Sequence, residues 1–594
     1  MPTRDARRIR TRLVGPVAVL ALFGIGIGAW LAGRPSGTDR EGRAETSLAT
    51  DQAAPNLANL GSPVATNLTA VEDYRSEYPF VDFAKQARPW FGGTPDTFDD
   101  GTTPRVDEFG NVVGLQPGKV ARTLIFDGEP ADPTLVGRRF VVRYAGRGTL
   151  DYELGARVVS RSKGRDVIEV VGNGPGGKNL VVIALAETAP SDPLRDLRIV
   201  PEGGICADDP FRRVGAADSC PDGAFRSFET HGAAIVFNPD FLERIRRYRG
   251  LRFMDWMRTN DSTQRDFADR PEVADQFWST EAGVPLEVMI DLVNRVDADP
   301  WFTIPHGATD NYVTQFAEVV RDRLEPDLIV HVEYSNEVWN SQFGQTTAVR
   351  DEADALDLGM TDHDGDPATP DVEDTTIGML RLYSRRAAEV HSLFAAAFDG
   401  TERLRRVMAS QAVVPFFTET ILGFENAAEH TDLFAVAPYF GDTASEPEAV
   451  AAYKELGVDG VFAWLRGERA EPRLELNLKR VDRVVAEQVA ATEQFGVALT
   501  TYEGGQHFVG ADPSDEALND ILDAVNRDPR MHDIYLTYLE NWRRRSDEVF
   551  WHFQSCDRWG GYGRWGALEY QSQPREQAPK FDALMDFIEE TVGP

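Results

Sequence analysis

Apolar stretches of two different periods alternate along the chain from residue 238 to its C-terminal end. Short β-branched or aromatic runs between turn residues predict strands, and longer stretches with apolar positions three or four residues apart predict helices. Strands are expected at 251–257, 301–306, 328–337, 406–411, 433–440, 497–503 and 549–554.

A helical pattern precedes each of these strands, and one more closes the chain. The first helix begins at Asn238-Pro239, a good cap followed by proline in the first turn, and stops near Gly250. Further helices are expected at 285–296, 311–324, 377–397, 418–430, 480–494, 514–544 and 576–592.

Seven such strands need an eighth to close an α/β fold of the (β/α)8 type, and 67–71 is the natural candidate. This TIM barrel is favoured over an open doubly wound sheet, because no Gly-x-Gly-x-x-Gly turn follows the first strand. Residues 102–200 differ, with short alternating runs between Gly-rich turns that predict an all-β, sandwich-like module. We therefore expect a catalytic barrel made of 64–101 and 201–594, with 102–200 inserted after its first strand.

The N-terminal segment 1–33 has the features of a targeting element. Five arginines precede an uncharged run at 13–33, which as a helix of about 1.5 Å per residue spans roughly 30 Å, enough for a bilayer core. We expect a transmembrane signal anchor that places the rest of the chain outside the cytoplasm, with a cleaved signal peptide as the alternative. The small, polar residues of 34–63 predict a flexible linker.

Composition narrows the choice of partners. The 594 residues are 27% charged and 42% hydrophobic, as in a globular protein, and the formal net charge is −34. Such a charge opposes binding to nucleic acid and to anionic lipid, and it suits a neutral glycan better than a polyanion. Contact with the membrane is expected only through the N-terminal helix.

Cysteines and acidic loops suggest two further features. Cys206 and Cys220 bracket a loop that an exported chain can close with a disulfide, whereas Cys556 is expected to be a buried thiol. Within 361–374, alternating aspartates resemble a calcium loop, but its glycine comes one place early and no glutamate stands at the twelfth position. A solvated acidic loop is the alternative there, and no cofactor or other metal is expected. The aspartates are Asp362, Asp364 and Asp366.

Two glutamates stand where predicted strands give way to loops. Glu337 ends the predicted strand 328–337 and lies in Val332-Glu333-Tyr334-Ser335-Asn336-Glu337-Val338-Trp339-Asn340. Glu503, 166 residues later, lies in Thr501-Tyr502-Glu503-Gly504-Gly505. Functional residues of TIM barrels lie at these C-terminal strand ends. Cleavage of a glycosidic bond needs two carboxylates, so the pair predicts a glycosidase, with a separation of about 5–5.5 Å if the reaction retains configuration.

Other polar and aromatic residues end neighbouring strands, and the ordered set resembles the clan A (β/α)8 retaining glycoside hydrolases, which include cellulases and other endoglycanases. Val338 follows Glu337 where many relatives have proline, which leaves the family within the clan open. The resemblance implies an acid/base at Glu337, a nucleophile at Glu503, a ligand of the sugar 2-hydroxyl at Asn336, nucleophile partners at Arg252 and Tyr439, and a sugar platform at Trp551.

Further candidates come from their position alone. His306 after the third strand is expected to bond a sugar hydroxyl, with the capping of a loop as the alternative. Trp256 and Trp339 near strand mouths are expected to stack on sugar rings, with packing alone as the alternative. Asp255 is either structural or a secondary sugar contact. Glu333 lies deeper on the same strand as Glu337 and is expected to pair with a cation of the barrel.

The sequence thus predicts an extracellular retaining glycoside hydrolase, endo-acting on a β-linked polysaccharide. The alternative is a non-catalytic carbohydrate-binding or cell-wall protein on the same barrel. A metal-dependent hydrolase would need a His-x-His or His/Asp cluster, and the nine histidines are scattered. A serine hydrolase lacks its Gly-x-Ser-x-Gly motif.

Overall fold

The computed structural model of the chain describes residues 59, 61–128, 132–172, 178–221, 224–359, 374–510 and 512–593. The expected membrane segment at 13–33 and the candidate calcium loop with Asp362, Asp364 and Asp366 lie outside these residues. Among the described residues, no helix has the length and apolar character needed to span a bilayer.

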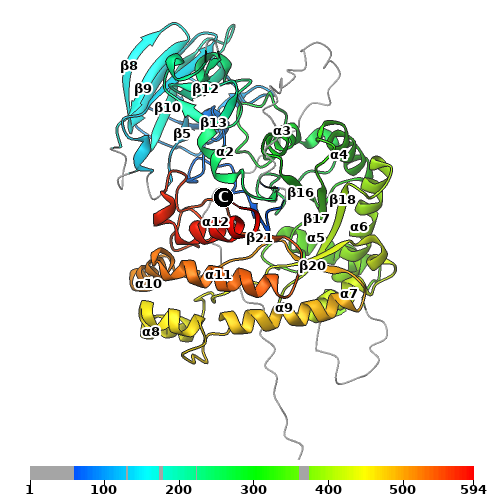
Figure 1. Cartoon of the computed structure of the whole chain (residues 1–594). Coiled ribbons are helices and arrows are strands. Elements are labelled where there is room, and N and C mark those ends of the chain that lie inside the picture. Colours follow the sequence, from blue (N-terminus) through cyan, green and yellow to red (C-terminus); the bar gives the residue numbers. More distant parts are fainter. Residues whose placement is uncertain are drawn as a thin grey trace, which may run out of the picture.

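Eight parallel strands form one sheet in which β1 lies between β15 and β21, so that the sheet curls back on itself. Its two edge strands, β20 and β21, are joined by side chains, since the Trp551 amide donates to the Thr501 hydroxyl (2.7 Å) and the Thr500 hydroxyl donates to the Val549 carbonyl (2.9 Å). The fold is therefore the expected TIM barrel (Figure 1). Its strands are β1 (Val64–Asn67), β15 (Gly250–Arg252), β16 (Asp299–Ile304), β17 (Val330–Tyr334), β18 (Leu404–Ala409), β19 (Leu433–Val436), β20 (Ala498–Thr501) and β21 (Phe550–His552).

Helices follow the barrel strands in the expected alternation. Those with predicted counterparts are α2 (Pro239–Ile245), α3 (Leu286–Val296), α4 (Asp310–Arg323), α6 (Asp374–Phe398), α7 (Pro415–Leu422), α9 (Leu478–Glu493), α10 (Glu516–Arg527), α11 (Arg530–Arg543) and α12 (Pro579–Val592).

Two helices that lie among the barrel strands were not predicted: α5 (Gly344–Ala355) and α8 (Pro447–Leu465). In α8 the backbone at Gly457 is non-helical, with φ 58° and ψ −176°, and buried residues on several sides blur the amphipathic stripe.

Between β1 and β15 the chain builds two antiparallel four-stranded sheets, in the orders β2-β5-β10-β7 and β11-β6-β9-β8. Their inner faces share one apolar core, to which Ile125 and Leu185 contribute from one sheet and Phe140 and Ile168 from the other. The strands are β2 (Phe91–Gly93), β5 (Val120–Ile125), β6 (Arg139–Ala145), β7 (Gly148–Leu154), β8 (Ala156–Ser162), β9 (Arg165–Val170), β10 (Val181–Thr188) and β11 (Arg195–Pro201).

The β-rich part of the chain extends on both sides of 102–200. It begins with β2, and it is followed by a small sheet of β12 (Gly204–Cys206), β13 (Asp209–Val214) and β14 (Phe225–Ser227), and by the short helix α1 (Phe228–His231). Cys206 and Cys220 form the expected disulfide beside this sheet, and Cys556 is a buried free thiol.

Several barrel strands end earlier in the sequence than the apolar runs predict. The predicted strand at 67–71 is displaced to β1, and that at 251–257 stops at Arg252. Beyond β15 the backbone turns, with the Met257 amide bonded to the Phe253 carbonyl, while Phe253 and Trp256 pack into the core outside the barrel. Apolar residues that follow a strand in sequence therefore cover the barrel wall rather than extend the sheet.

Candidate active site

The centre of the barrel mouth is Arg252, the last residue of β15, whose side chain is 0% exposed. Its guanidinium donates to Asn67 Oδ1 (3.0 Å), Glu333 Oε2 (2.9 Å), Asn336 Oδ1 (2.8 Å) and Glu503 Oε1 (3.0 Å). One buried cation thus joins residues from four strands, β1, β15, β17 and β20, or from the loops that follow them.

Glu333 on β17 pairs with Arg252, as expected for a carboxylate below the mouth. Its Oε2 also accepts a hydrogen bond from Trp301 Nε1 at 2.9 Å. Burial raises the pKa of Glu333, while Arg252 acts in the opposite direction. Because the carboxylate of Glu333 is almost fully buried, it positions Arg252 and does not contact a substrate.

Glu503 follows β20 by two residues and has donors on both carboxylate oxygens. Oε1 accepts from Arg252, and Oε2 accepts from the Tyr439 hydroxyl at 2.8 Å. Burial raises the pKa of Glu503 to about 8, the guanidinium of Arg252 opposes this rise, and the nearby charge of Glu337 adds to it.

Glu337 follows β17 and is half-buried. Its Oε1 accepts from the Tyr502 hydroxyl (2.7 Å) and its Oε2 from Asn340 Nδ2 (2.9 Å). The backbone reaches this position through two left-handed residues, Ser335 (φ 61°) and Glu337 itself (φ 40°). Such a conformation costs a non-glycine residue about 1 kcal/mol or more, and backbone strain of this kind concentrates at functional sites.

Two cross-links bring the two glutamates to the same part of the mouth. Tyr502, the residue before Glu503, bonds Glu337, while Asn336, the residue before Glu337, bonds the guanidinium that holds Glu503. The structure therefore brings together five of the predicted site residues, namely Arg252, Asn336, Glu337, Tyr439 and Glu503.

Two predicted sugar platforms are wrong. Trp551 is 1% exposed and lies in the barrel interior, edge-on to Trp301 with ring centroids 4.8 Å apart. Trp256 is 0% exposed, packs against Phe80 and Phe253, and donates its indole N–H to the Thr69 carbonyl at 3.0 Å. Neither ring has a free face for a sugar, because packing against other aromatic side chains fills the space beside each.

Other half-buried aromatic rings surround the glutamates. Trp339, a predicted platform, stands edge-on to Tyr502 with centroids 6.1 Å apart. Phe553, which sequence reasoning missed, is edge-on to both Tyr439 (6.4 Å) and Trp565 (6.0 Å). The signal for Phe553 was its position, since it comes two residues after Trp551 on the same run and therefore one layer nearer the mouth.

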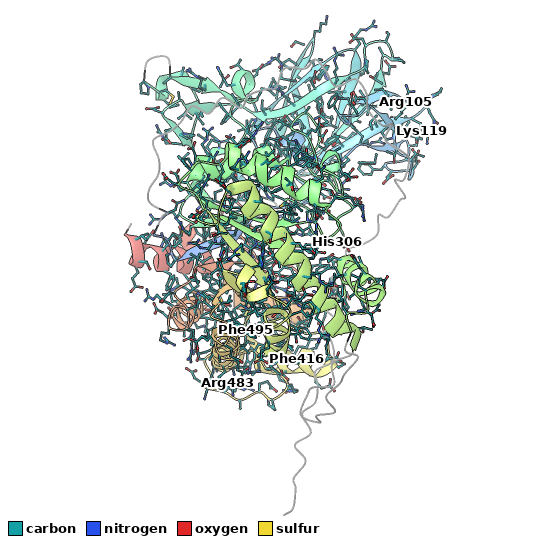
Figure 2. The ribbon with its side chains drawn as sticks, turned by 90° about the vertical axis from the view of Figure 1, so that its right-hand side faces the viewer. Arg105, Lys119, His306, Phe416, Arg483 and Phe495 are labelled. Atoms are coloured by element: carbon teal, nitrogen blue, oxygen red, sulfur yellow. A yellow bond between two sulfur atoms is a disulfide. The ribbon has the colours of Figure 1, made fainter. Side chains whose placement is uncertain are left out.

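His306 follows β16 at the mouth and is half-buried. Its Nδ1 is buried and has no hydrogen-bond partner among the described residues, and burial lowers its pKa. Figure 2 shows His306 between the β-rich end, which carries Arg105 and Lys119, and the opposite end with Arg483 and Phe495. A neutral imidazole there can accept or donate a hydrogen bond.

Asp255 lies beside the mouth in a network of charges. Its Oδ2 accepts from Gln554 Nε2 at 2.8 Å, and burial raises its pKa. Nearby, Glu72 pairs with Arg75 (3.1 Å) and Arg258 (2.8 Å). The Glu72–Arg258 pair ties the loop after β1 to the loop after β15, so it shapes one wall of the mouth.

One group among the described residues has the ligand atoms for a metal ion, namely His532, Asp582 and Asp586 on α11 and α12. Arg575 forms ion pairs with both aspartates, so a cation of the chain already offsets part of their charge. The group lies on outer helices and has no part in the mouth.

Comparison with known proteins gives only remote similarities. No family model matches the chain, and no curated protein matches its sequence. Similar solved structures include the catalytic core of a xylanase A, with 9% identity and a TM-score of 0.33 over 59% of this chain and 92% of that one. A fungal β-1,4-galactanase gives 9% and 0.32 over 58% and 91%, and a Thermotoga maritima β-glucosidase gives 11% and 0.31 over 58% and 84%. Similarity at this level assigns no function.

Proposed function

We propose that this chain is a retaining glycoside hydrolase that cleaves a β-linked polysaccharide. The observation that carries the proposal is the pair of glutamates from the ends of β17 and β20, each with hydrogen-bond donors on both carboxylate oxygens. Two such carboxylates at one barrel mouth are the groups that a double displacement at a sugar needs.

In the first step Glu503 attacks the anomeric carbon, and the bond from that carbon to the leaving oxygen breaks. The proton of Glu337 passes to the leaving oxygen, so a neutral alcohol departs and a glycosyl ester forms on Glu503. In the second step Glu337 takes a proton from water, the water oxygen attacks the anomeric carbon, and the ester bond breaks. Configuration at that carbon is retained.

The environment of the two glutamates supports this division of roles. The Arg252 guanidinium lies 3.0 Å from the carboxylate of Glu503. Among the described residues, no cation forms an ion pair with Glu337. The Arg252 guanidinium and the Tyr439 hydroxyl oppose the rise in the pKa of Glu503 that burial causes, and they would hold its ionised carboxylate in place for the attack.

Substrate contacts follow from the rings and polar groups at the mouth. Asn336 would reach the sugar 2-hydroxyl, and the accessible edge of the half-buried His306 ring would meet another hydroxyl. With Trp551 inside the barrel, stacking would fall to Phe553 and Trp339. We further propose endo cleavage outside the cytoplasm, with 13–33 as a membrane anchor.

One observation favours a non-catalytic carbohydrate-binding protein as the second candidate. A carboxyl group with a pKa of about 8 is largely protonated at neutral pH, and a neutral Glu503 would hydrogen-bond a sugar without attacking it.

Chemical rescue of a nucleophile variant decides between the two. Glu503→Ala should abolish turnover of an aryl β-glycoside, and azide should restore it with a product of inverted configuration, because the small anion occupies the vacated space. The control is Glu425→Ala on the outer surface, which should keep wild-type turnover. Full activity of Glu503→Ala, or a polysaccharide panel that the wild type binds without cleaving, would contradict the hydrolase proposal.

A further inference from the structure

The sheet β11-β6-β9-β8 concentrates basic residues in an otherwise acidic chain. Residues 138–170, which span β6 to β9, contain eight Lys and Arg and four Asp and Glu, whereas the whole chain has a net charge of −34. Figure 1 shows β8 and β9 at one end of the molecule, far from α8 and α9 at the other.

Arginines flank the outer face of this sheet, whose middle row of Val141, Val167 and Val200 is buried under Ile205 and Phe228. Phe140, Val142, Ile168 and Ile199 point into the shared core, so the residues adjacent to them in sequence point outward. We call the outward arginines the arginine face; they are Arg139, Arg143, Arg157, Arg165 and Arg198.

Strand register places these arginines in two rows. In one row Arg198 lies opposite Arg143, which lies opposite Arg165, so three like charges stand on three adjacent strands. In the other row Arg139 and Arg157 flank Glu169. Like charges directly opposite each other destabilise a sheet, so folding alone does not account for the first row.

Each row holds one carboxylate between two guanidinium groups. Glu229 of α1 accepts from Arg143 (2.9 Å) and in bidentate fashion from Arg165 (2.7 and 3.0 Å). Glu169 accepts from Arg157 at 2.5 Å and from Arg139 at 3.4 Å. Each group of two arginines and one carboxylate keeps a charge of +1.

The guanidinium groups remain open to solvent. The exposed fraction of the side chain is 48% for Arg139 and Arg143, 65% for Arg157 and 36% for Arg165. The remaining N–H donors of each guanidinium group are therefore accessible to a second carboxylate. That carboxylate could bind in the bidentate manner seen between Glu229 and Arg165.

We propose that the arginine face binds a polysaccharide that carries carboxylate groups, such as a polyuronate chain. The two rows lie four residues apart along β6, roughly 13 Å at about 3.3 Å per residue, on either side of the covered valine row. A chain of several uronate residues is long enough to contact both. The site is separate from the barrel mouth and does not depend on the hydrolase proposal.

The negative charge of the rest of the chain argues against the binding of other polyanions. DNA and anionic bilayers present charge over a broad area, and a chain of net charge −34 repels such surfaces outside the narrow face. A thin, flexible glycan can follow the arginine face without approaching the acidic barrel.

Affinity electrophoresis tests the proposal with the full-length protein. Polygalacturonate in the gel should retard the wild type, and the retardation should weaken as NaCl rises from about 50 to about 500 mM. Arg143→Gln/Arg157→Gln/Arg165→Gln should bind at least about tenfold more weakly, and Arg143→Gln or Arg157→Gln alone should lose part of that affinity. Neutral hydroxyethylcellulose should not distinguish the triple variant from the wild type.

The matched control is Arg321→Gln/Arg466→Gln/Arg545→Gln. These side chains are 40%, 40% and 41% exposed, each is paired with an acidic residue, and none belongs to the β-rich part of the chain. This control should bind polygalacturonate as the wild type does. Equal retardation of the wild type and of the triple variant of the arginine face, no retardation at all, or tighter binding to a DNA duplex than to polygalacturonate would overturn the proposal.

Discussion

Arg252 is the residue on which the geometry of the mouth depends most. It is fully buried and is the cation in contact with both Glu333 and Glu503. Its guanidinium also lies over the rings of Trp301 and Tyr502, at 5.4 and 5.2 Å from their centroids. Loss of this side chain would leave two buried carboxylates without their counter-charge.

Arg252→Met should therefore destabilise the fold by about 3–5 kcal/mol, the usual cost of breaking a buried ion pair on one side. Urea denaturation measures the free energy of unfolding. Arg545→Met is the control, because its pair with Asp482 is solvent-exposed and should be worth less than about 1 kcal/mol. Equal effects of the two substitutions would mean that Arg252 does not neutralise the buried carboxylates of Glu333 and Glu503.

Glu503 should make stability depend on pH in a predictable direction. Its pKa is about 8 in the folded protein against an ordinary value of 4.5, so the folded state keeps a proton that the unfolded state releases. This stabilising contribution is complete below about pH 4.5 and is lost as pH rises through about 8.

Glu503→Gln has no such proton to release. Its melting temperature should rise relative to that of the wild type as pH increases from about 4.5 to about 8. Thermal melts of both proteins across this range measure the difference, with Glu425→Gln as an exposed control. A difference in melting temperature that stays constant with pH would contradict the raised pKa.

At the scale of elements, the alternation of strands and helices could be predicted from sequence because their periods differ over long stretches. The exact ends could not, since apolar residues such as Phe253 and Trp256 leave the sheet and pack outside it. Glu337 and Glu503 were identified because each stands at the end of a predicted strand. Arg252 lies at the start of the predicted strand 251–257 and was identified through the family resemblance.

Two of the aromatic candidates, Trp551 and Trp256, were wrong for a related reason. A strand end predicts which residues come near the mouth, but not which layer of the barrel each ring occupies. Trp551 belongs to the interior layer with Trp301, and Phe553, two residues later, lies beside Tyr439. Successive residues of a strand point to opposite faces of the sheet, so the sequence predicts which face a side chain is on. Its depth in the barrel depends on the register with the neighbouring strands.

Substitution at these two positions should separate packing from binding. Trp551→Ala removes a ring from the barrel interior and should cost about 3–5 kcal/mol of unfolding free energy. Phe553→Ala removes a half-buried ring, so it should leave the melting temperature within a few degrees and raise the KM for a polysaccharide several-fold. A stable Trp551→Ala protein with the larger rise in KM would reverse the two assignments.

The whole molecule combines a barrel with a β-rich part that contains the basic stretch 138–170. Eight of the basic residues fall within 138–170, while the chain as a whole has 96 Asp and Glu against 62 Lys and Arg. The excess negative charge therefore lies mainly outside the arginine face. Its self-repulsion opposes the compact state, whereas the many surface ion pairs act in favour of it.

Salt should reveal which of these two effects dominates. Exposed ion pairs contribute little each, and a net charge of −34 repels itself throughout the fold, so screening should stabilise the protein. The melting temperature should rise as NaCl increases from about 0.01 to about 0.1 M, where the screening length falls from about 30 to about 10 Å. An equal osmolarity of sucrose is the control, because it changes no screening. A melting temperature that falls over this range would mean that the ion pairs, such as those linking Arg575 to α12, outweigh the net charge.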